Sequence, residues 1–121
     1  MITFIVGLLG SGKTTLANSY ECTIIDDISI KSIDDFSNII GDIVITDPNA
    51  TIVSKITIVE KCQEWFPNHD IEFIAFENDP DQCINNIINR DSRIISESYI
   101  RHLSSKYDTS QYSKVIPVYK T

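Results

Sequence analysis

Residues 2–20 read ITFIVGLLGSGKTTLANSY, and this stretch decides the fold of the chain. It opens with a continuous apolar run, Ile2–Val6, which is typical of a strand that is covered on both faces of a parallel sheet. The residues that follow, Gly7–Thr14, match the pattern G-x-x-x-x-G-K-[ST] at every specified position. A short helical segment, Thr14–Tyr20, comes next. Strand, glycine-rich loop and helix in this order predict a phosphate-binding P-loop.

Each specified position of this loop has a physical reason. Gly7, Gly10 and Gly12 lack a Cβ, so the backbone can turn tightly and direct successive N–H groups at phosphate oxygens. The start of the following helix adds its positive end. Lys13 is expected to reach the β- and γ-phosphates, and the Thr14 hydroxyl to bind Mg²⁺, so the sequence predicts a site for Mg-ATP or Mg-GTP. The residues expected to contact the nucleotide are Gly7, Gly10, Ser11, Gly12, Lys13, Thr14 and Thr15.

The rest of the chain alternates between short apolar runs and helical patterns, without repeats or linker-like stretches. The runs that predict strands are Ile2–Val6, Cys22–Ile25, Ile43–Thr46, Ile71–Phe76 and Val115–Tyr119. Strands that alternate with helices indicate a parallel sheet with right-handed crossovers. We therefore expect residues 1–121 to form a single three-layer α/β/α domain of the P-loop NTPase type, with a five-stranded parallel sheet in the nucleotide-kinase-like order 2-3-1-4-5.

Helical patterns fill the gaps between these runs. Apolar residues at Ile52, Ile56, Val59 and Phe66 recur at helical spacing and predict an amphipathic helix over Thr51–Phe66. A short helix is also expected around Ile33–Ile39, between the second and third strands.

Two more helices are expected before the last strand. Asp79 as N-cap, Pro80 in the first turn and Gln82 closing a capping box predict the start of one of them. Its buried face is expected to hold Ile84, Ile87 and Ile88. Ser96 is expected to cap the last helix. The inward residues of that helix are expected to be Ile100, Leu103 and Tyr107.

Composition limits the classes of function. The formal net charge of −7 provides no general field that would attract a polyanion, so any nucleic-acid contact needs a local basic patch. Cys22, Cys62 and Cys83 lack CxxC spacing, which argues against a disulfide framework and against a zinc site. No signal-peptide pattern precedes the first strand, and no apolar run is long enough to span a membrane. We therefore expect a cytoplasmic protein without a membrane partner.

Carboxylates follow two of the apolar runs. Asp26 and Asp27 come after the second run, and Asp47 comes after the third. The carboxyl ends of parallel strands meet at one edge, where ligands bind and where the P-loop also lies. Asp26 or Asp27 is therefore expected to accept a proton from an attacking hydroxyl, and Asp47 to support the magnesium ion or the base. The alternative is that these aspartates only cap loops.

A pair of arginines marks the end of the helix that starts near Asp79. Arg90 and Arg93 lie in the segment IINRDSR, shortly before the last helix. Planar guanidinium groups at this place would fold over the triphosphate and stabilise charge in a transition state. A solvated helix end, where cations suit the helix dipole, is the alternative reading.

With these motifs in place, the chain resembles the P-loop kinases related to the phage-type polynucleotide 5′-hydroxyl kinase, and more loosely the zeta-toxin and small-metabolite kinases. The first strand, loop and helix of that family resemble GLLGSGKTTLA, and its third strand with a D-x-N ending resembles DIVITDPNAT. Its fourth strand, helix and arginine-bearing lid resemble EWFPNHDIEFIAFENDPDQCINNIINRDSR. The resemblance covers nearly the whole chain.

The resemblance implies roles for individual residues. Asp26 falls on the first position of the family's DD pair, which is the general base, and Asp47 and Asn49 fall on the D-x-N ending. Arg90 and Arg93 fall on the lid arginines. The segment Ile28–Asp42 is much shorter than in the polynucleotide kinases and lacks their acceptor-binding arginine.

The resulting hypothesis is an ATP-binding kinase that transfers the γ-phosphoryl group to a hydroxyl acceptor. A polynucleotide 5′-hydroxyl and a nucleoside or other small metabolite are both open as acceptors. The rival hypotheses are a non-catalytic nucleotide-binding module, which the short Ile28–Asp42 segment favours, and a simple NTPase. The oligomeric state is open.

Overall fold

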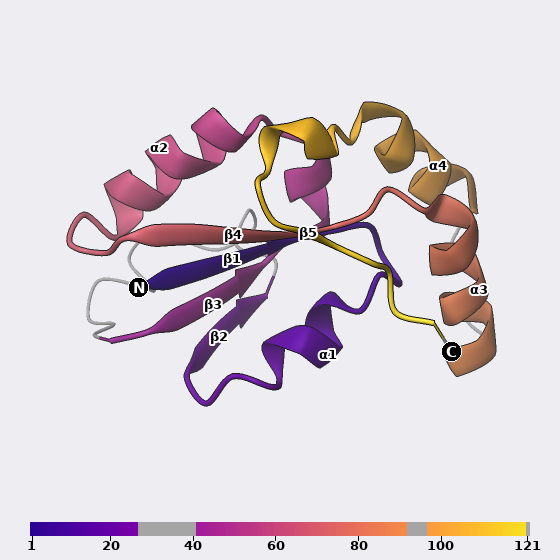
Figure 1. The fold of residues 1–121 in the computed structure, drawn as a ribbon, viewed down its shortest axis with the longest axis horizontal. Helices are drawn as coiled ribbons and strands as arrows, with labels where there is room; N and C mark the ends of the chain where they lie inside the picture. The colour runs from indigo at the N-terminus through magenta and orange to yellow at the C-terminus, as the bar shows by residue number, and fades with distance from the viewer. Residues whose placement is uncertain (27–40, 92–96, 121) are drawn as a thin grey trace.

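The central feature of the computed structural model, which describes residues 1–26, 41–91 and 97–120, is one parallel sheet (Figure 1). In these residues the strands are ordered β2-β3-β1-β4-β5, and all their pairings are parallel. Their bounds are β1 Ile2–Val6, β2 Thr23–Asp26, β3 Ile43–Thr46, β4 Ile71–Phe76 and β5 Val115–Ile116. The predicted α/β class and strand order are confirmed.

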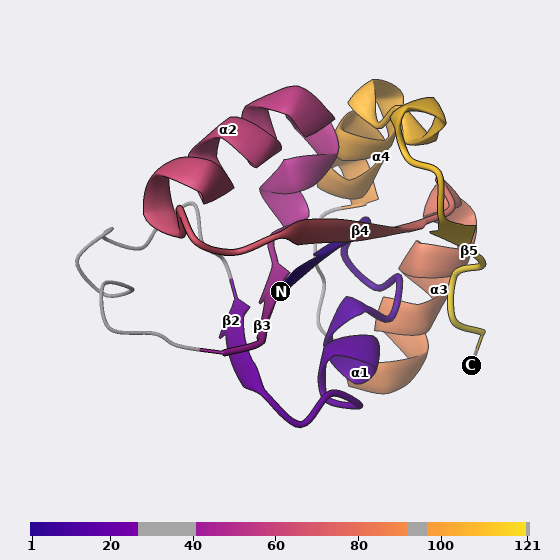
Figure 2. The ribbon, with the colours of Figure 1, turned by 60° about the vertical axis from the view of Figure 1, so that its left-hand side comes forward.

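Helices cover both faces of this sheet. Their bounds are α1 Lys13–Ala17, α2 Lys55–Trp65, α3 Pro80–Asp91 and α4 Glu97–Lys106, with 3₁₀ turns η3 Pro48–Ile52 and η4 Thr109–Gln111. Figure 2 shows α1 and α2 on opposite faces of the sheet, with α3 and α4 beyond the ends of β1 and β4. None of the helices in the described ranges is long and apolar enough to cross a membrane.

The central strand β1 is buried along its whole length, as is β3 beside it. Ile5 pairs with Thr46 of β3 on one side and with Ile74 of β4 on the other. Because helices lie on both faces, the strands need apolar residues at successive positions rather than at alternate ones. This is the physical reason why continuous apolar runs predicted β1, β3 and β4 with their observed bounds, whereas β2 begins and ends one residue later than the predicted run Cys22–Ile25.

The last strand is shorter than its apolar pattern predicted. It ends at Ile116 rather than at Tyr119. Pro117 follows, and a proline has no N–H to donate to the β4 ladder. The chain therefore leaves the sheet, and Tyr119 donates its backbone N–H to the carbonyl of Ser11 in the P-loop, at 3.0 Å.

The helix predicted over Thr51–Phe66 differs from the observed one in start and in buried face. Ser54 caps α2, its Oγ accepting from the N–H of Thr57 at 3.4 Å, and the preceding residues form the separate turn η3. Ile58 and Cys62 are the buried residues of α2, while Ile56 is 68% exposed. The prediction was wrong here because its periodicity was counted from a residue that lies outside the α-helix.

Expectations for the next two helices were closer. The Asp79 carboxylate accepts from the N–H of Gln82 at 3.1 Å, which confirms the predicted start of α3. The side chain of Gln82 closes no capping box, because the Asp79 N–H donates to the carbonyl of Glu77 at 3.1 Å; the Gln82 amide donates to Asn86. Ile87 is buried, but Ile88 is exposed, so that part of the predicted face was wrong.

In α4 the predicted inward residues Ile100 and Leu103 are buried, and so is Tyr107 just beyond its end. The predicted cap Ser96 and the predicted helix around Ile33–Ile39 lie outside the described residues.

Candidate nucleotide-binding site

The P-loop runs from the end of β1 to the start of α1 and needs glycine at two of its positions. Gly10 and Gly12 have φ angles of 83° and 107°, in the left-handed region that favours glycine. A Cβ on Gly10 would lie 2.4 Å from the Cys83 carbonyl oxygen, and one on Gly12 would lie 2.9 Å from the Cβ of Tyr119. Both backbone conformation and close packing therefore exclude other residues there.

The side chain of Lys13 folds back over its own loop. Its Nζ donates to the carbonyl of Leu8 at 2.8 Å, and the residue is only 8% exposed. An ammonium group buried to this degree needs acceptors close by. A phosphate oxygen that enters the loop would offer the same ammonium a charged acceptor, which makes a stronger hydrogen bond than a carbonyl.

Ser11 carries a polar group that is left without a partner inside the loop. The residue is fully buried, and its Oγ makes no hydrogen bond within the part of the chain that the structure describes. A buried hydroxyl without a partner destabilises the fold by about 1–3 kcal/mol. A polar ligand within the loop would relieve that cost. Thr14 and Thr15 are exposed at the start of α1, where a Mg-nucleotide would meet them.

Asn86 of α3 holds the P-loop from outside. Its Nδ2 donates to the carbonyl of Gly10 at 2.9 Å and to the carbonyl of Tyr119. Its Oδ1 accepts from Gln82 at 2.9 Å, which fixes the orientation of the amide. The sequence analysis missed Asn86. The one available sign was the spacing of Gln82 and Asn86, four residues apart, which places two polar side chains on one helix face.

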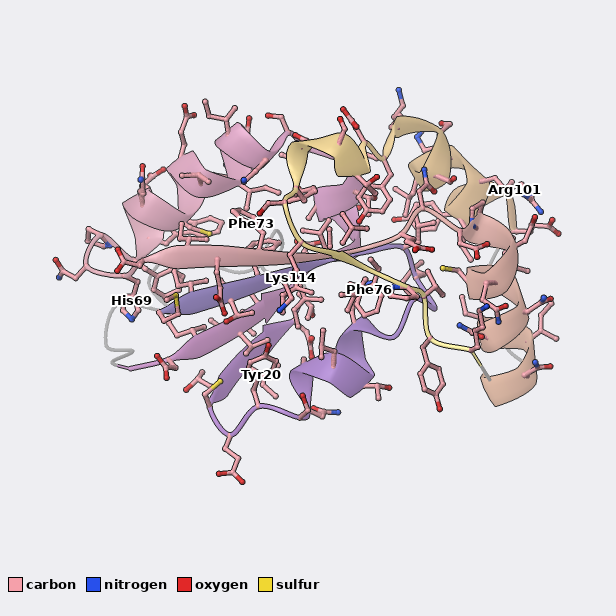
Figure 3. The ribbon with its side chains drawn as sticks, viewed as in Figure 1. Tyr20, His69, Phe73, Phe76, Arg101 and Lys114 are labelled. Carbon is pink, nitrogen blue, oxygen red and sulfur yellow. The ribbon has the colours of Figure 1, made fainter. Side chains whose placement is uncertain are left out.

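Aromatic side chains support the base of the loop. Phe76 at the end of β4 would contact a Cβ on Gly7 at 3.1 Å, so it packs directly against the loop. The Tyr107 hydroxyl donates to the carbonyl of Phe76 at 2.5 Å, and burial raises the pKa of that hydroxyl. In Figure 3 Phe76 lies near the crossing C-terminal segment, whereas His69 lies at the opposite end of the sheet. The loop-bearing edge is therefore distinct from the edge with His69.

Asp26 lies at the end of β2, in register with Thr46 of β3. The Thr46 hydroxyl donates to the Asp26 carboxylate, and Asp26 is exposed while Thr46 is buried. The hydrogen bond orients the carboxylate without removing it from solvent. An oriented, accessible carboxylate can accept a proton from a ligand group that comes within hydrogen-bond distance.

Asp47 follows Thr46 directly but lies on the other face of the sheet, because successive strand residues point to opposite faces. It is 3% exposed, and its carboxylate accepts from the N–H of Asn49 at 2.9 Å, so it caps η3. It also lines a cavity beneath α2 together with Ile58 and Cys62. The structure thus brings Asp26 and Asp47 to one edge but separates their side chains by the thickness of the sheet.

The remaining predicted residues are only partly described. Asp27 and Arg93 lie outside the described residues. Arg90 belongs to α3, and its backbone lies one helical turn after Asn86, on the same helix face. The helix that clasps the P-loop is therefore also the helix that carries Arg90.

The donor set suits Mg²⁺ better than a metal that needs a full protein cage. No group of three or more His, Cys, Asp or Glu side chains gathers within the described ranges. Mg²⁺ is commonly held by one or two protein oxygens, substrate phosphates and waters. The Thr14 hydroxyl and the Asp26 carboxylate are both exposed, so their oxygens are accessible to such an ion.

A parallel sheet in this order, with a P-loop between its central strand and α1, defines the P-loop NTPase fold of the nucleotide-kinase type. No family model matches the chain. Its sequence is 28% identical to uncharacterized protein R277 of Acanthamoeba polyphaga mimivirus over 127 aligned positions, covering 93% of this chain and 90% of that protein.

Solved structures with this fold include P-loop kinases. A gluconokinase from Sinorhizobium meliloti superposes with a TM-score of 0.71 at 10% identity, over 99% of this chain and 83% of that one. Kti12 of Chaetomium thermophilum, in complex with ADP-AlF3, gives 0.64 at 15% identity, over 98% and 88%. Shikimate kinase of Bacteroides thetaiotaomicron gives 0.54 at 14%, over 98% and 86%. At these identities the likeness shows a shared fold.

Proposed function

We propose that this protein is a kinase that transfers the γ-phosphoryl group of Mg-ATP or Mg-GTP to a hydroxyl acceptor. The observation that carries the proposal is the P-loop itself, with the buried ammonium of Lys13 and the partnerless hydroxyl of Ser11. The exposed carboxylate of Asp26, oriented by Thr46 at the same edge, adds a base. Two of the structural neighbours described above are named as kinases, which supports this class of reaction.

In the proposed reaction the acceptor hydroxyl gives its proton to the carboxylate of Asp26. Its oxygen forms a bond to the γ-phosphorus while the bond from that phosphorus to the bridging β–γ oxygen breaks, and the nucleoside diphosphate leaves. Lys13 neutralises charge on the phosphates, and Arg90 and Arg93 are proposed to close over them. Mg²⁺ bound through the Thr14 hydroxyl would supply further charge neutralisation, whereas the predicted supporting role of Asp47 does not fit its buried place on the opposite face of the sheet.

A non-catalytic nucleotide-binding module is the second candidate. The short Ile28–Asp42 segment favours it, since the polynucleotide kinases that the sequence resembles build their acceptor wall there. A simple NTPase ranks third. Thermal stabilisation by Mg-nucleotide, without transfer to any acceptor and without hydrolysis, would distinguish the module from the kinase and from the NTPase.

The test is a Lys13→Ala variant assayed with γ-labelled ATP and a panel of acceptors: an oligonucleotide with a free 5′-hydroxyl, nucleosides and small alcohols. We expect phosphoryl transfer to fall by about 10²–10³-fold, because a charged donor to the transferred group is lost. Transfer by Lys13→Ala at the parent's rate would refute the proposed function. Circular dichroism of the variant serves as the control for folding.

A further inference from the structure

A cavity of about 170 Å³ lies beneath α2. The helix α2 covers the face of the sheet opposite α1 (Figure 2). Most of its wall is apolar, formed by Phe4, Ala50, Ile58, Cys62 and Trp65. The buried carboxylate of Asp47 also lines it, together with the polar residue Asn49 and the cationic residue Lys61. An apolar cavity with a small number of fixed polar groups is the usual form of a small-molecule site.

We propose that this cavity is the acceptor pocket of the kinase, and that its ligand is a compact hydroxyl compound with an apolar body about the size of one ring. This inference rests on the proposed function. Of the two acceptors that the sequence left open, the proposed pocket favours the small metabolite over the polynucleotide 5′-hydroxyl.

The first reason for this assignment is the position of the cavity at the edge of the sheet. Ile5 is in register with Thr46, so Asp47 is level with Val6, the last residue before the P-loop. The charged end of the cavity therefore lies at the edge of the sheet where phosphates are expected. Asp26 and Asp47 flank this edge from opposite faces, so an acceptor whose body lies in the cavity has to extend beyond Asp47 and around the edge to bring its hydroxyl to Asp26.

The second reason is the chemistry of the residues that line the cavity. The Asp47 carboxylate is held in place by the N–H of Asn49, at 2.9 Å, and the Asn49 side chain in turn accepts from the Tyr99 hydroxyl at 3.3 Å. A fixed carboxylate accepts a hydrogen bond from a hydroxyl and so orients it. The apolar wall favours a carbon skeleton over a sugar-like ligand that carries a hydroxyl on every carbon, because each buried hydroxyl without a partner weakens binding.

The third reason is the size of the cavity, which limits the size of the ligand. An apolar cavity of about 150 Å³ accommodates benzene, so this one accepts roughly one ring. A nucleotide of a polynucleotide chain carries a base, a sugar and phosphates, and exceeds that volume. The charge of the chain, −7, also opposes the approach of a polyanionic acceptor.

The test uses benzyl alcohol as the probe and the full chain with a non-hydrolysable Mg-ATP analogue. Binding is measured by saturation-transfer NMR in the parent and in Val53→Phe, which adds a ring to the cavity wall. The matched control is Ile52→Phe, because Ile52 is exposed and does not line the cavity. If Val53→Phe does not fold, Ala50→Val fills the same space with less added volume.

We expect benzyl alcohol to bind the parent and Ile52→Phe equally, and the cavity-filling variant at least about tenfold more weakly. Equal binding by the folded cavity-filling variant and the parent would overturn the assignment, as would the absence of any binding to the parent. The cavity would then be a packing void beneath the helix.

A parallel assay follows transfer of labelled γ-phosphate to the same alcohol and to a 5′-hydroxyl oligonucleotide. Transfer to the alcohol that the cavity-filling variant abolishes supports the pocket and the kinase together. Transfer to the oligonucleotide that this variant leaves unchanged would overturn the pocket and keep the kinase. Alcohol binding that the variant blocks, without transfer to any acceptor, would refute the proposed function and keep the cavity as a ligand site.

Discussion

The two faces of the sheet differ at the edge where the strands end. The face of α1 carries the glycine-rich loop, the buried ammonium of Lys13 and the exposed carboxylate of Asp26. On the face of α2, the buried carboxylate of Asp47 borders a mostly apolar cavity that Asn49 and Lys61 also line. Two aspartates at the ends of neighbouring strands thus occupy opposite environments. The aspartate on the face of α1 is therefore accessible to solvent, whereas the aspartate on the face of α2 is buried and held in a fixed orientation.

The largest expected effect separates the two aspartates by kinetics and stability. Asp26→Asn should lower phosphoryl transfer by about 10²–10⁴-fold, the usual contribution of a general base, with little change in melting temperature because the side chain is exposed. Asp47→Ala should instead destabilise the fold by about 0.5–2 kcal/mol, because the cap of η3 is lost. Steady-state rates and thermal melts of both variants make the measurement.

The contrast between the two aspartates would be contradicted if Asp26→Asn changed the stability and Asp47→Ala changed the rate of transfer. An Asp26→Asn protein that transfers phosphate at the parent's rate would leave the face of α1 without its base. An Asp47→Ala protein as stable as the parent would show that this carboxylate does not fix the turn.

A smaller effect is expected from the clasp on the P-loop. Asn86→Ala removes the donor to the carbonyls of Gly10 and Tyr119, which are then left without it beside a buried site. We expect a loss of about 1–3 kcal/mol in the free energy of unfolding. Nucleotide affinity should also fall by about tenfold, because the loop is no longer held in its binding shape.

Asn85→Ala is the matched control, since Asn85 is the adjacent residue of α3 and is exposed. Titration with a fluorescent nucleotide and urea denaturation report the two quantities. An Asn86→Ala variant that binds nucleotide as tightly as the parent would show that the loop keeps its shape without the clasp.

The smallest expected effect concerns pH and the thiol on the face of α2. Burial raises the pKa of Cys62 from 9.0 to about 11. The unfolded chain therefore loses this proton at a lower pH than the folded one. The contribution of this thiol to the free energy of unfolding is fully present below pH 9 and is lost as the pH rises toward 11. At pH 10 about 1.4 kcal/mol of it has been lost.

Urea denaturation of the parent and of Cys62→Ala at pH 8 and pH 10 tests this. The cavity left by alanine destabilises the variant equally at both values, so only the difference between them is informative. The parent should lose about 1.4 kcal/mol more than the variant over this range. Equal losses would mean that the thiol ionises in the folded protein as it does in solution.

The sequence by itself determined the fold class, the strand order and the P-loop. Local sequence patterns determine these features. Continuous apolar runs are required by a sheet that is covered on both faces, and the residue spacing within Gly7–Thr14 is that of a loop that surrounds a phosphate. The start of α3 was also local, because Asp79 caps it within one turn. The nucleotide-contacting roles of the P-loop residues, and the catalytic roles of Asp26, Arg90 and Arg93, stay predictions.

Only the tertiary structure decided which face each side chain occupies and what holds the loop. The buried face of α2 depends on a helix start that Ser54 fixes, and a shift of that start moves Ile56 to the surface. Asn86 meets Gly10 across 76 positions of sequence, a distance over which no local pattern acts. The separation of Asp26 from Asp47 follows from strand register and pleat, which the chain acquires only when β1, β2 and β3 pair.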